Sequence, residues 1–308
     1  MDRVLGFIQG TDNGPLIACV AALHGNEQVG IKAFKRVFDK IQTHKIQVQG
    51  SLLGLAGNVK AISTNTRFID YDLNRSWTDM HLQHAQIQGD FKRAEDEEMI
   101  DLKNRLDTYF SKGTRPKVLI DLHATSSANG NFIVIPENDA ANPIVKSLQQ
   151  PIVVNLDQYV NGTMLQHYHT QGVLAFAFEG GMIGTPEALI LHEAGLWEIL
   201  KASGVIQAHD QPAPDHYSEI LRKFTIGLPN AVKVVFRHPI NLHEDFKMKE
   251  GFVNFQQINR GDHLADTIYG PLFSPTDGMI FMPLYQKEGN DGFFIVREVN
   301  SNQVLSNN

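Results

Sequence analysis

The sequence has few features that would cross-link the chain or anchor it in a membrane. Cys19 is the only cysteine among 308 residues, so no intramolecular disulfide can form. Because Cys19 lies in an apolar stretch, we expect it to be a buried packing residue. The longest apolar run, residues 16–23, is far shorter than the roughly 18 residues that a membrane span needs. We therefore expect neither a disulfide-rich protein nor a membrane protein.

Basic residues are also too few and too scattered for nucleic-acid binding. The chain has 27 lysines and arginines against 34 aspartates and glutamates, a formal net charge of −7, and no lysine- or arginine-rich run. A nucleic-acid partner needs the opposite balance, because binding to phosphates is largely electrostatic. The N-terminus shows no apolar core followed by a small-residue cleavage site, so we expect a cytoplasmic protein.

Several common catalytic motifs are missing as well. The sequence has no G-x-S-x-G elbow, which argues against a serine hydrolase of that type. It has no Walker motif and no glycine-rich dinucleotide motif, which argues against the corresponding nucleotide-binding folds.

What the chain does contain is an alternation of apolar strands and amphipathic helices. Thr185 is a predicted N-cap, followed by a helix that Gly204 ends, and Asn26 is the predicted N-cap of an earlier helix. A third helix is expected over residues 95–110. Short apolar runs predict buried strands at residues 15–23, 46–55, 117–122, 132–135 and 173–178. This order predicts an α/β fold with a mixed, largely parallel sheet and flanking helices.

The composition changes after about residue 208. Residues 210–215 contain two prolines and read as a linker. Beyond them we expect no helix, only short β-like runs at residues 231–236, 251–255 and 278–284. The sequence therefore predicts a hydrolase-like α/β domain over residues 1–208 and a small all-β domain over residues 216–308. Residues 57–77, polar and without periodicity, are expected to form a long functional loop.

Histidine and glutamate side chains follow two of the predicted strands. His24 and Glu27 are three positions apart at the exit of one strand, and His123 ends another. Open α/β sheets place their sites at these strand ends. Two imidazoles and one carboxylate form a typical ligand set for catalytic zinc, with the fourth position open to water. Taken alone, each of these residues has an ordinary structural explanation; Glu27, for example, could be a glutamate favoured in the first turn of a helix.

Further polar residues could supply the rest of a hydrolytic site. Glu179 ends a third strand and is followed by two glycines, and a carboxylate there could act as a general base. Arg67 could stabilise an oxyanion, while Asn74 and Arg75 place an amide beside a guanidinium suited to binding a carboxylate. Each of these residues also has a non-catalytic explanation: Glu179 could be an ordinary exposed glutamate, and the other three could belong to a solvated loop with scattered charges.

These motifs in this order resemble the succinylglutamate desuccinylase/aspartoacylase family, which is similar to the zinc carboxypeptidases. The resemblance rests on His-Gly-Asn-Glu at residues 24–27, Asp-Leu-Asn-Arg at residues 72–75 and Asp-Leu-His at residues 121–123. It covers nearly the whole chain. It implies one zinc ion held by His24, Glu27 and His123.

The same resemblance implies roles for the other residues. Glu179 matches the general base and acid of the family, and Arg67 matches the residue that polarises the substrate carbonyl. Asn74 and Arg75 match the residues that hold the α-carboxylate. A tyrosine near the C-terminus also enters the site in the family, and Tyr285 is the best match. The small β domain is expected to pack beside the site and restrict entry.

The chain also departs from the family pattern. Aspartoacylases have an arginine before the catalytic glutamate that reads the aspartate side chain, whereas residues 165–169 contain none. His169 could take that place when protonated or through a hydrogen bond. Losing a charged hydrogen-bond partner costs on the order of 1.5–3 kcal/mol, so selectivity for aspartate is doubtful. Ala124 also replaces the asparagine that is usual in aspartoacylases.

The sequence thus predicts a zinc-dependent amidohydrolase that cleaves the amide bond of a small N-acyl amino acid. Two alternatives remain open: a zinc carboxypeptidase acting on peptides, and a zinc-binding protein without catalysis. Other divalent metals also accept histidine and carboxylate ligands. A homo-oligomer through apolar edges of the β domain is left open, as are the acyl group and the amino acid.

Overall fold

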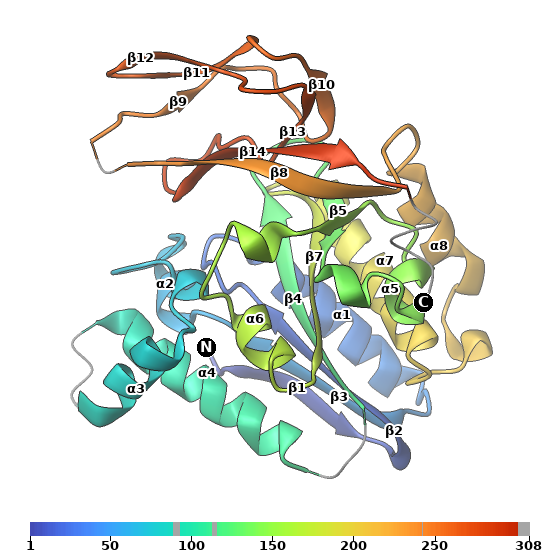
Figure 1. Cartoon of the computed structure of the whole chain (residues 1–308). Helices are drawn as coiled ribbons and strands as arrows, with labels where there is room; N and C mark the ends of the chain where they lie inside the picture. The colour runs from blue at the N-terminus through green and yellow to red at the C-terminus, as the bar shows by residue number, and fades with distance from the viewer. Residues whose placement is uncertain (89–92, 113–115, 242, 301–308) are drawn as a thin grey trace.

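The computed structural model describes residues 1–88, 93–112, 116–241 and 243–300 and is built around one large mixed sheet (Figure 1). Its strand order is β1-β3-β2-β4-β7-β5-β6-β8-β14-β13-β10, and a second sheet has the order β12-β11-β9. The strands are β1 (Val4–Gln9), β2 (Thr11–Ala21), β3 (Gln49–Ala56), β4 (Lys117–Thr125), β5 (Asn131–Val134), β6 (Ile152–Val154), β7 (Leu174–Met182), β8 (Ala231–Pro239), β9 (Lys247–Met248), β10 (Gln256–Ile258), β11 (His263–Thr267), β12 (Gly270–Phe273), β13 (Gly278–Phe281) and β14 (Asp291–Glu298).

The centre of the large sheet is parallel. Strand β2 pairs in parallel with β3 and β4, and β4 pairs in parallel with β7. Helices cover both faces of these strands, so their side chains are buried on both sides and their sequences are apolar without alternation. Cys19 lies on β2, is 1% exposed, and burial raises the pKa of its thiol to about 12. The expected α/β fold is confirmed.

Helices form a layer on each face of the sheet (Figure 1). One hydrophobic cluster joins the sheet to α1, α5, α7 and α8, and a second joins the opposite face to α3, α4 and α6. The α-helices are α1 (Val29–Thr43), α2 (Val59–Thr64), α3 (Asp79–Gln88), α4 (Ala94–Phe110), α5 (Pro143–Ser147), α6 (Met164–His169), α7 (Pro186–Ala202) and α8 (Pro214–Lys223). The 3₁₀ turns are η1 (Leu73–Arg75), η2 (Glu137–Asp139), η3 (Leu156–Gln158) and η4 (Ala208–Asp210). As predicted, Thr185 caps α7 by accepting a hydrogen bond from the Ala188 amide.

The C-terminal strands continue the large sheet. β8 pairs in parallel with β6, and β14 and β13 extend the sheet in antiparallel pairs. The small sheet shares a hydrophobic cluster with β13 and β14, to which Leu264, Ile280 and Phe293 contribute. The division into domains at residues 1–208 and 216–308 stays a prediction, and residues 301–308 of the second lie outside the described part.

Two segments expected to be irregular contain helices. Residues 57–77 include α2, in which the Asn58 side chain accepts a hydrogen bond from the Ala61 amide. A helix of six residues is too short to show a periodic pattern in the sequence. The predicted linker leads into α8, although no helix was expected there. α8 is amphipathic, and Tyr217 and Leu221 join the same hydrophobic cluster as α7.

Two local predictions were wrong. Residues 251–255 are not a strand, because Gly251 and Phe255 have φ values of 96° and 65°, outside the β region. Asn26 does not cap α1: Gln28 occupies the N-cap position without a side-chain hydrogen bond. The Asn26 side chain instead donates a hydrogen bond to Gln286 across 3.3 Å.

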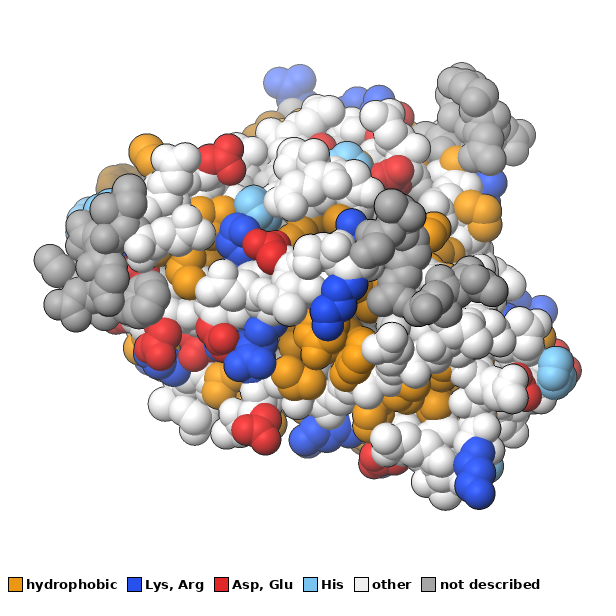
Figure 2. Space-filling view, turned by 90° about the horizontal axis from the view of Figure 1, so that it is seen from below, with side chains coloured by type: hydrophobic (Ala, Val, Ile, Leu, Met, Phe, Trp, Pro, Cys, Tyr) orange, Lys and Arg blue, Asp and Glu red, His pale blue; other side chains and the backbone are white. Residues whose placement is uncertain are grey.

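The surface carries charged side chains of both signs, as the composition leads one to expect. On the face seen from below, acidic and basic side chains lie interspersed, with hydrophobic side chains between them (Figure 2). Among the described residues, no helix combines the length and the apolar character needed to cross a bilayer.

Candidate active site

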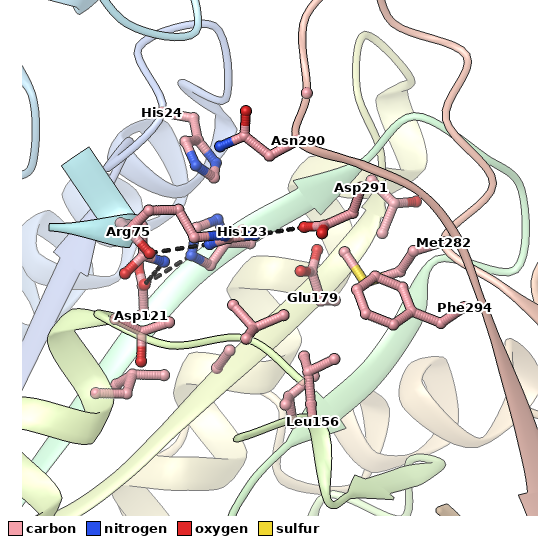
Figure 3. Close-up of a pocket in the computed structure, with 18 of the residues that line it drawn as sticks. His24, Arg75, Asp121, His123, Leu156, Glu179, Met282, Asn290, Asp291 and Phe294 are labelled. Carbon is pink, nitrogen blue, oxygen red and sulfur yellow. Dashed lines mark hydrogen bonds and ion pairs between the residues drawn. The ribbon is translucent and has the colours of Figure 1, made fainter. Parts of the chain in front are cut away.

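Three neighbouring strands bring the candidate site together. His24 follows β2, His123 lies on β4, and Glu179 on β7 is directly opposite His123 in the parallel register. The carboxyl ends of parallel strands meet at one edge of a sheet, so residues far apart in sequence converge there. Figure 3 shows His123 and Glu179 on adjacent strands, with His24 close by.

His24, Glu27 and His123 form a compact group that could hold a metal ion. Each residue offers one ligand atom, and these atoms all lie within 4.8 Å of one another. Nδ1 of His24 lies 2.9 Å from Glu27 Oε1, and Nδ1 of His123 lies 2.9 Å from Glu27 Oε2. All three side chains are buried.

A second carboxylate faces the other nitrogen of each histidine. Asp72 Oδ1 lies 3.2 Å from His24 Nε2, and Asp121 Oδ2 lies 2.6 Å from His123 Nε2. When Nε2–H donates a hydrogen bond to such a carboxylate, Nδ1 of the neutral ring keeps a lone pair on the side of the shared Glu27. Histidines that bind metals are typically oriented in this way. The donor set, two imidazoles and one carboxylate, therefore fits a divalent ion such as zinc.

The electrostatics of the group favour charged carboxylates. Burial opposes the ionisation of Glu27, yet the nearby His24 and His123 hold its pKa well below the usual range. Burial also opposes the ionisation of Asp72, and His24 and Arg67 lower its pKa. For His123, burial favours the neutral ring, but Asp121 outweighs this effect and raises its pKa. The site is thus prepared for positive charge.

Glu179 differs from these carboxylates. Its side chain is buried, and its Oε2 atom has no hydrogen-bond partner among the described residues. Burial, together with the charges of Glu27 and Asp121, raises the pKa of Glu179 to about 8, against the opposing effect of His123. A carboxyl group with this pKa can both accept and release a proton near neutral pH.

The turn that carries His24 and Glu27 depends on close backbone packing. A Cβ atom at Gly25 would lie 2.2 Å from the carbonyl carbon of Ala61 in α2. The Gly25 amide donates a hydrogen bond to the Arg67 carbonyl oxygen across 3.0 Å. The glycine in the His-Gly-Asn-Glu motif therefore lets the metal-site turn lie directly against the segment that carries Arg67.

Arg67 lies at the edge of the metal group. Its NH2 atom donates to Asp72 Oδ2 across 3.0 Å, and its NH1 atom lies 3.5 Å from Glu27 Oε1. Its buried Nε atom has no hydrogen-bond partner among the described residues. The guanidinium is thus held in place while part of its hydrogen-bonding capacity is unused.

Asn74 and Arg75 lie on η1, where Asp72 caps the turn. The Asn74 amide group donates to Asp121 Oδ2 across 3.4 Å and accepts from the Met164 amide across 3.0 Å. Arg75 NH2 donates to Asp291 Oδ2 across 2.9 Å (Figure 3).

Asp291 is a site residue that the sequence did not reveal. It lies at the start of β14 and binds Arg75 with one oxygen, while its Oδ1 accepts from Arg237 Nε across 2.6 Å. Arg237 in turn donates to the Tyr159 carbonyl oxygen. Nothing in the turn-like sequence around residue 291 signals this role, because the contact joins residues 216 positions apart.

Glu95 is a second residue that the sequence did not reveal. It is fully buried at the start of α4, and its carboxylate accepts hydrogen bonds from the backbone amides of Ile69 and Asp70 at 2.7 and 2.9 Å. It also accepts a hydrogen bond from Asn58. Glu95 therefore holds the segment between Arg67 and η1 in one conformation.

Two weaker predictions have different outcomes. His169 lines the cavity beside the site, and its Nε2 atom lies 2.8 Å from Asp139 Oδ2. Tyr285 is not among the residues that line the cavity. Its hydroxyl donates to the carbonyl oxygen of Lys249 across 2.8 Å and accepts from the Phe252 amide. The structure therefore brings His169, but not the Tyr285 hydroxyl, to the site.

A cavity of about 430 Å³ lies at the candidate site. Its lining includes the candidate metal group, Arg67, Arg75 and Glu179. Other lining residues come from α6 and from the segment before β14, so the C-terminal region contributes to the lining. The apolar members of the lining include Val134, Leu156, Val160, Met282 and Phe294.

Comparison with known proteins identifies the family to which the chain is similar. The family model for the succinylglutamate desuccinylase/aspartoacylase catalytic domain matches residues 13–194. A succinylglutamate desuccinylase from Pseudomonas paraeruginosa is 30% identical over 112 residues, which are 36% of this chain and 32% of that protein. A probable aspartoacylase from Prochlorococcus marinus is 31% identical over 127 residues, 40% of this chain and 38% of that protein. The chain thus matches about a third of the length of these curated relatives.

A solved structure shares the fold over a longer range. The crystal structure of a succinylglutamate desuccinylase from Vibrio parahaemolyticus superposes with a TM-score of 0.66 at 18% identity. The match covers 95% of this chain and 83% of the other. The similarity therefore extends beyond the catalytic domain into the C-terminal strands.

Proposed function

The chain belongs to the succinylglutamate desuccinylase/aspartoacylase family, and from this premise we propose that it is a zinc-dependent amidohydrolase. Its substrate is a small N-acyl amino acid, and its products are a carboxylate and a free amino acid. One observation carries the proposal. Glu179, a buried glutamate with an oxygen that no described residue contacts by a hydrogen bond, lines the same cavity as the group formed by His24, Glu27 and His123.

His24, Glu27 and His123 would hold the metal. A zinc ion bound there would act as a Lewis acid on the scissile carbonyl and would lower the pKa of a bound water to about 7. Asp72 and Asp121 keep the two imidazoles oriented, since each faces the nitrogen that points away from Glu27.

Glu179 moves the proton. It accepts a proton from the attacking water and later donates it to the nitrogen of the leaving amine as the C–N bond breaks. The raised pKa suits both steps, because a group that titrates near neutral pH can work in either direction. Burial keeps the carboxyl group away from bulk solvent, so its proton is delivered within the cavity.

The two arginines recognise the substrate. Arg67 stabilises the oxyanion that develops on the carbonyl oxygen, because its guanidinium is held beside Glu27 and retains an unused donor. Arg75, with Asn74 beside it, binds the α-carboxylate. Asp291 and the Asn74 carbonyl oxygen hold Arg75 in a defined position.

The decisive experiment measures activity of the zinc-loaded protein on a panel of N-acyl amino acids, their C-terminal amides and short peptides. Glu179→Gln is expected to lower kcat on the best substrate by about 10²- to 10⁴-fold while zinc content is unchanged. Glu187→Gln is the matched control, because Glu187 is an exposed glutamate in the first turn of α7. The amides should be poorer substrates, since Arg75 then has no carboxylate to bind.

The panel also separates the alternatives. Sustained cleavage of longer peptides would make the protein a carboxypeptidase instead. Tight zinc binding without turnover of any acyl compound would point to a non-catalytic zinc protein. Equal activity of Glu179→Gln and Glu187→Gln would overturn the role of Glu179.

A further inference from the structure

One wall of the cavity is apolar and belongs to a hydrophobic cluster under the C-terminal strands. Val134, Leu156, Val160, Met282 and Phe294 are all members of this cluster, and all of them line the cavity. Val134, Leu156 and Met282 are only partly buried. A ligand in the cavity would therefore meet the open side of a hydrophobic core.

This wall lies away from the carboxylate-binding residues. Figure 3 shows Arg75 on one side of Glu179 and both Met282 and Phe294 on the other. In an N-acyl amino acid, the carboxylate and the acyl chain extend from opposite sides of the scissile amide. With the carboxylate at Arg75 and the amide at Glu179, the acyl chain is directed toward the apolar wall.

Within the described part of the chain, the cavity offers no unpaired cation that could bind a second carboxylate. Among the described residues that line it, the basic side chains are Arg67, Arg75 and the histidines. In the proposed function Arg67 already stabilises the oxyanion and Arg75 already binds the α-carboxylate, and each is also paired with an aspartate, Asp72 and Asp291 respectively. His24 and His123 belong to the metal group, and His169 lies against Asp139. A charged end on the acyl chain would thus be buried against apolar side chains without a partner.

We propose that the apolar wall is an acyl subsite, and that the preferred acyl group is an uncharged hydrocarbon chain longer than acetyl. The inference rests on the proposed function, because it names the substrate class of that same site. This preference would distinguish the chain from enzymes that remove a succinyl group, which carries a second carboxylate.

Burial of a hydrocarbon chain has a measurable effect on rate. Each methylene that leaves water is expected to raise kcat/KM about three- to fourfold until the wall is filled. A terminal carboxylate reverses this gain, because its desolvation is not compensated by a cation.

The test is an acyl series on one amino acid. The amino acid is the one whose N-acetyl derivative the zinc-loaded protein hydrolyses fastest, and the series is acetyl, butyryl, hexanoyl and succinyl. We expect kcat/KM to rise from acetyl to hexanoyl and to fall at least tenfold from butyryl to succinyl. Calorimetry provides a readout independent of turnover: hexanoate should bind more tightly than succinate.

Two variants locate the effect. Leu156→Lys places a cation on the partly buried η3 turn, and it should lower the hexanoyl rate and raise the succinyl rate. Ile226→Lys is the matched control, since Ile226 is 80% exposed and is not among the residues that line the cavity. Equal melting temperatures of the two variants would show that Leu156→Lys folds.

The outcomes are distinguishable from failure of the proposed function. If no acyl amino acid is hydrolysed, the proposed function itself fails. If the acetyl and succinyl derivatives are hydrolysed as fast as the hexanoyl derivative, the acyl subsite is overturned. An unchanged acyl profile in Leu156→Lys would also overturn it.

Discussion

At the scale of single residues, neighbouring carboxylates differ because of what surrounds them. Asp72 and Glu27 lie beside basic groups, which lower their pKa values despite burial. Glu179 is equally buried but has no hydrogen-bond partner on Oε2 among the described residues, and burial raises its pKa to about 8. The same side-chain chemistry therefore gives a charged carboxylate in one surrounding and, in the other, a carboxyl group that holds its proton up to near neutral pH.

This difference predicts how stability depends on pH in the metal-free protein. The pKa of Glu179 is raised from 4.5 in the unfolded chain to about 8 in the folded one. Between these values the folded state keeps a proton that the unfolded state has released, so stability falls as pH rises. Glu179→Gln removes this titration. Its free energy of unfolding should therefore exceed that of the parent by an amount that grows from about pH 5 to pH 8, to on the order of a few kcal/mol.

Urea unfolding at pH 5, 7 and 9 in the presence of a chelator measures this difference. Glu187→Gln should follow the parent protein at every pH, because Glu187 is exposed. A constant difference between Glu179→Gln and the parent over this range would contradict the raised pKa.

At the scale of elements, the site depends on a turn and a loop that support each other. The turn after β2 carries His24 and Glu27, and the segment after α2 carries Arg67. The hydrogen bond from the Gly25 amide to the Arg67 carbonyl oxygen joins them, and Glu95 holds the loop from the side of α4. The positions of His24, Glu27 and Arg67 are thereby coupled.

Gly25→Ala should disrupt this junction. The added Cβ would lie 2.2 Å from backbone atoms of Ala61, so the turn must move, at a cost of about 1–3 kcal/mol. Because His24 and Glu27 move with the turn, zinc affinity should fall together with stability. Equilibrium dialysis and thermal unfolding measure the two effects.

Gly172→Ala is the control that separates the effect of backbone strain from the effect of displacing His24 and Glu27. Gly172 has a φ of 77°, and no described atom lies within 4 Å of the place that its Cβ would take, so an alanine there costs backbone strain without a clash. Its zinc affinity should equal that of the parent. A zinc affinity of Gly25→Ala that also equals that of the parent would show that the turn tolerates the extra atom.

At the scale of the whole molecule, the cavity is closed by segments from both ends of the chain. The three-layer α/β part supplies the candidate metal ligands and Glu179, whereas the strands after residue 231 supply Asp291 and part of the apolar wall. The ion pair between Arg75 and Asp291 joins the two parts within the cavity. Since β8 pairs with β6, the C-terminal strands are held by the sheet itself.

Binding of metal to this assembled site should stabilise the whole fold. Zinc at 100 times its dissociation constant adds about 2.7 kcal/mol to the free energy of unfolding, provided that the unfolded chain does not bind it. Thermal unfolding should then shift upward by several degrees. The double variant His24→Ala/His123→Ala should lose this shift.

The control is the double variant His209→Ala/His216→Ala, which removes two histidines that are exposed. It should respond to zinc as the parent does. A shift that persists in His24→Ala/His123→Ala would place the stabilising ion elsewhere.

The sequence by itself determined the α/β class and the residues of the candidate metal group. Both depend on local signals: apolar runs long enough for buried strands, and His, Glu and Asp side chains at their ends. Short elements such as α2 were missed because fewer than two turns leave no period to detect. α8 was missed because Pro212 and Pro214 at its start resembled a linker, although a helix tolerates proline in its first turn.

Only the tertiary structure decided which distant residues complete the cavity. Asp291 reaches Arg75 across 216 positions, and the Tyr285 hydroxyl binds the backbone at Lys249 and Phe252 instead of entering the site. The apolar wall likewise consists of residues that look like ordinary core in the sequence. Such contacts follow from how strands β5 to β14 pack, and no local spacing encodes that packing. The residues of the candidate site could therefore be predicted from the sequence, whereas the shape of the cavity was set by the fold.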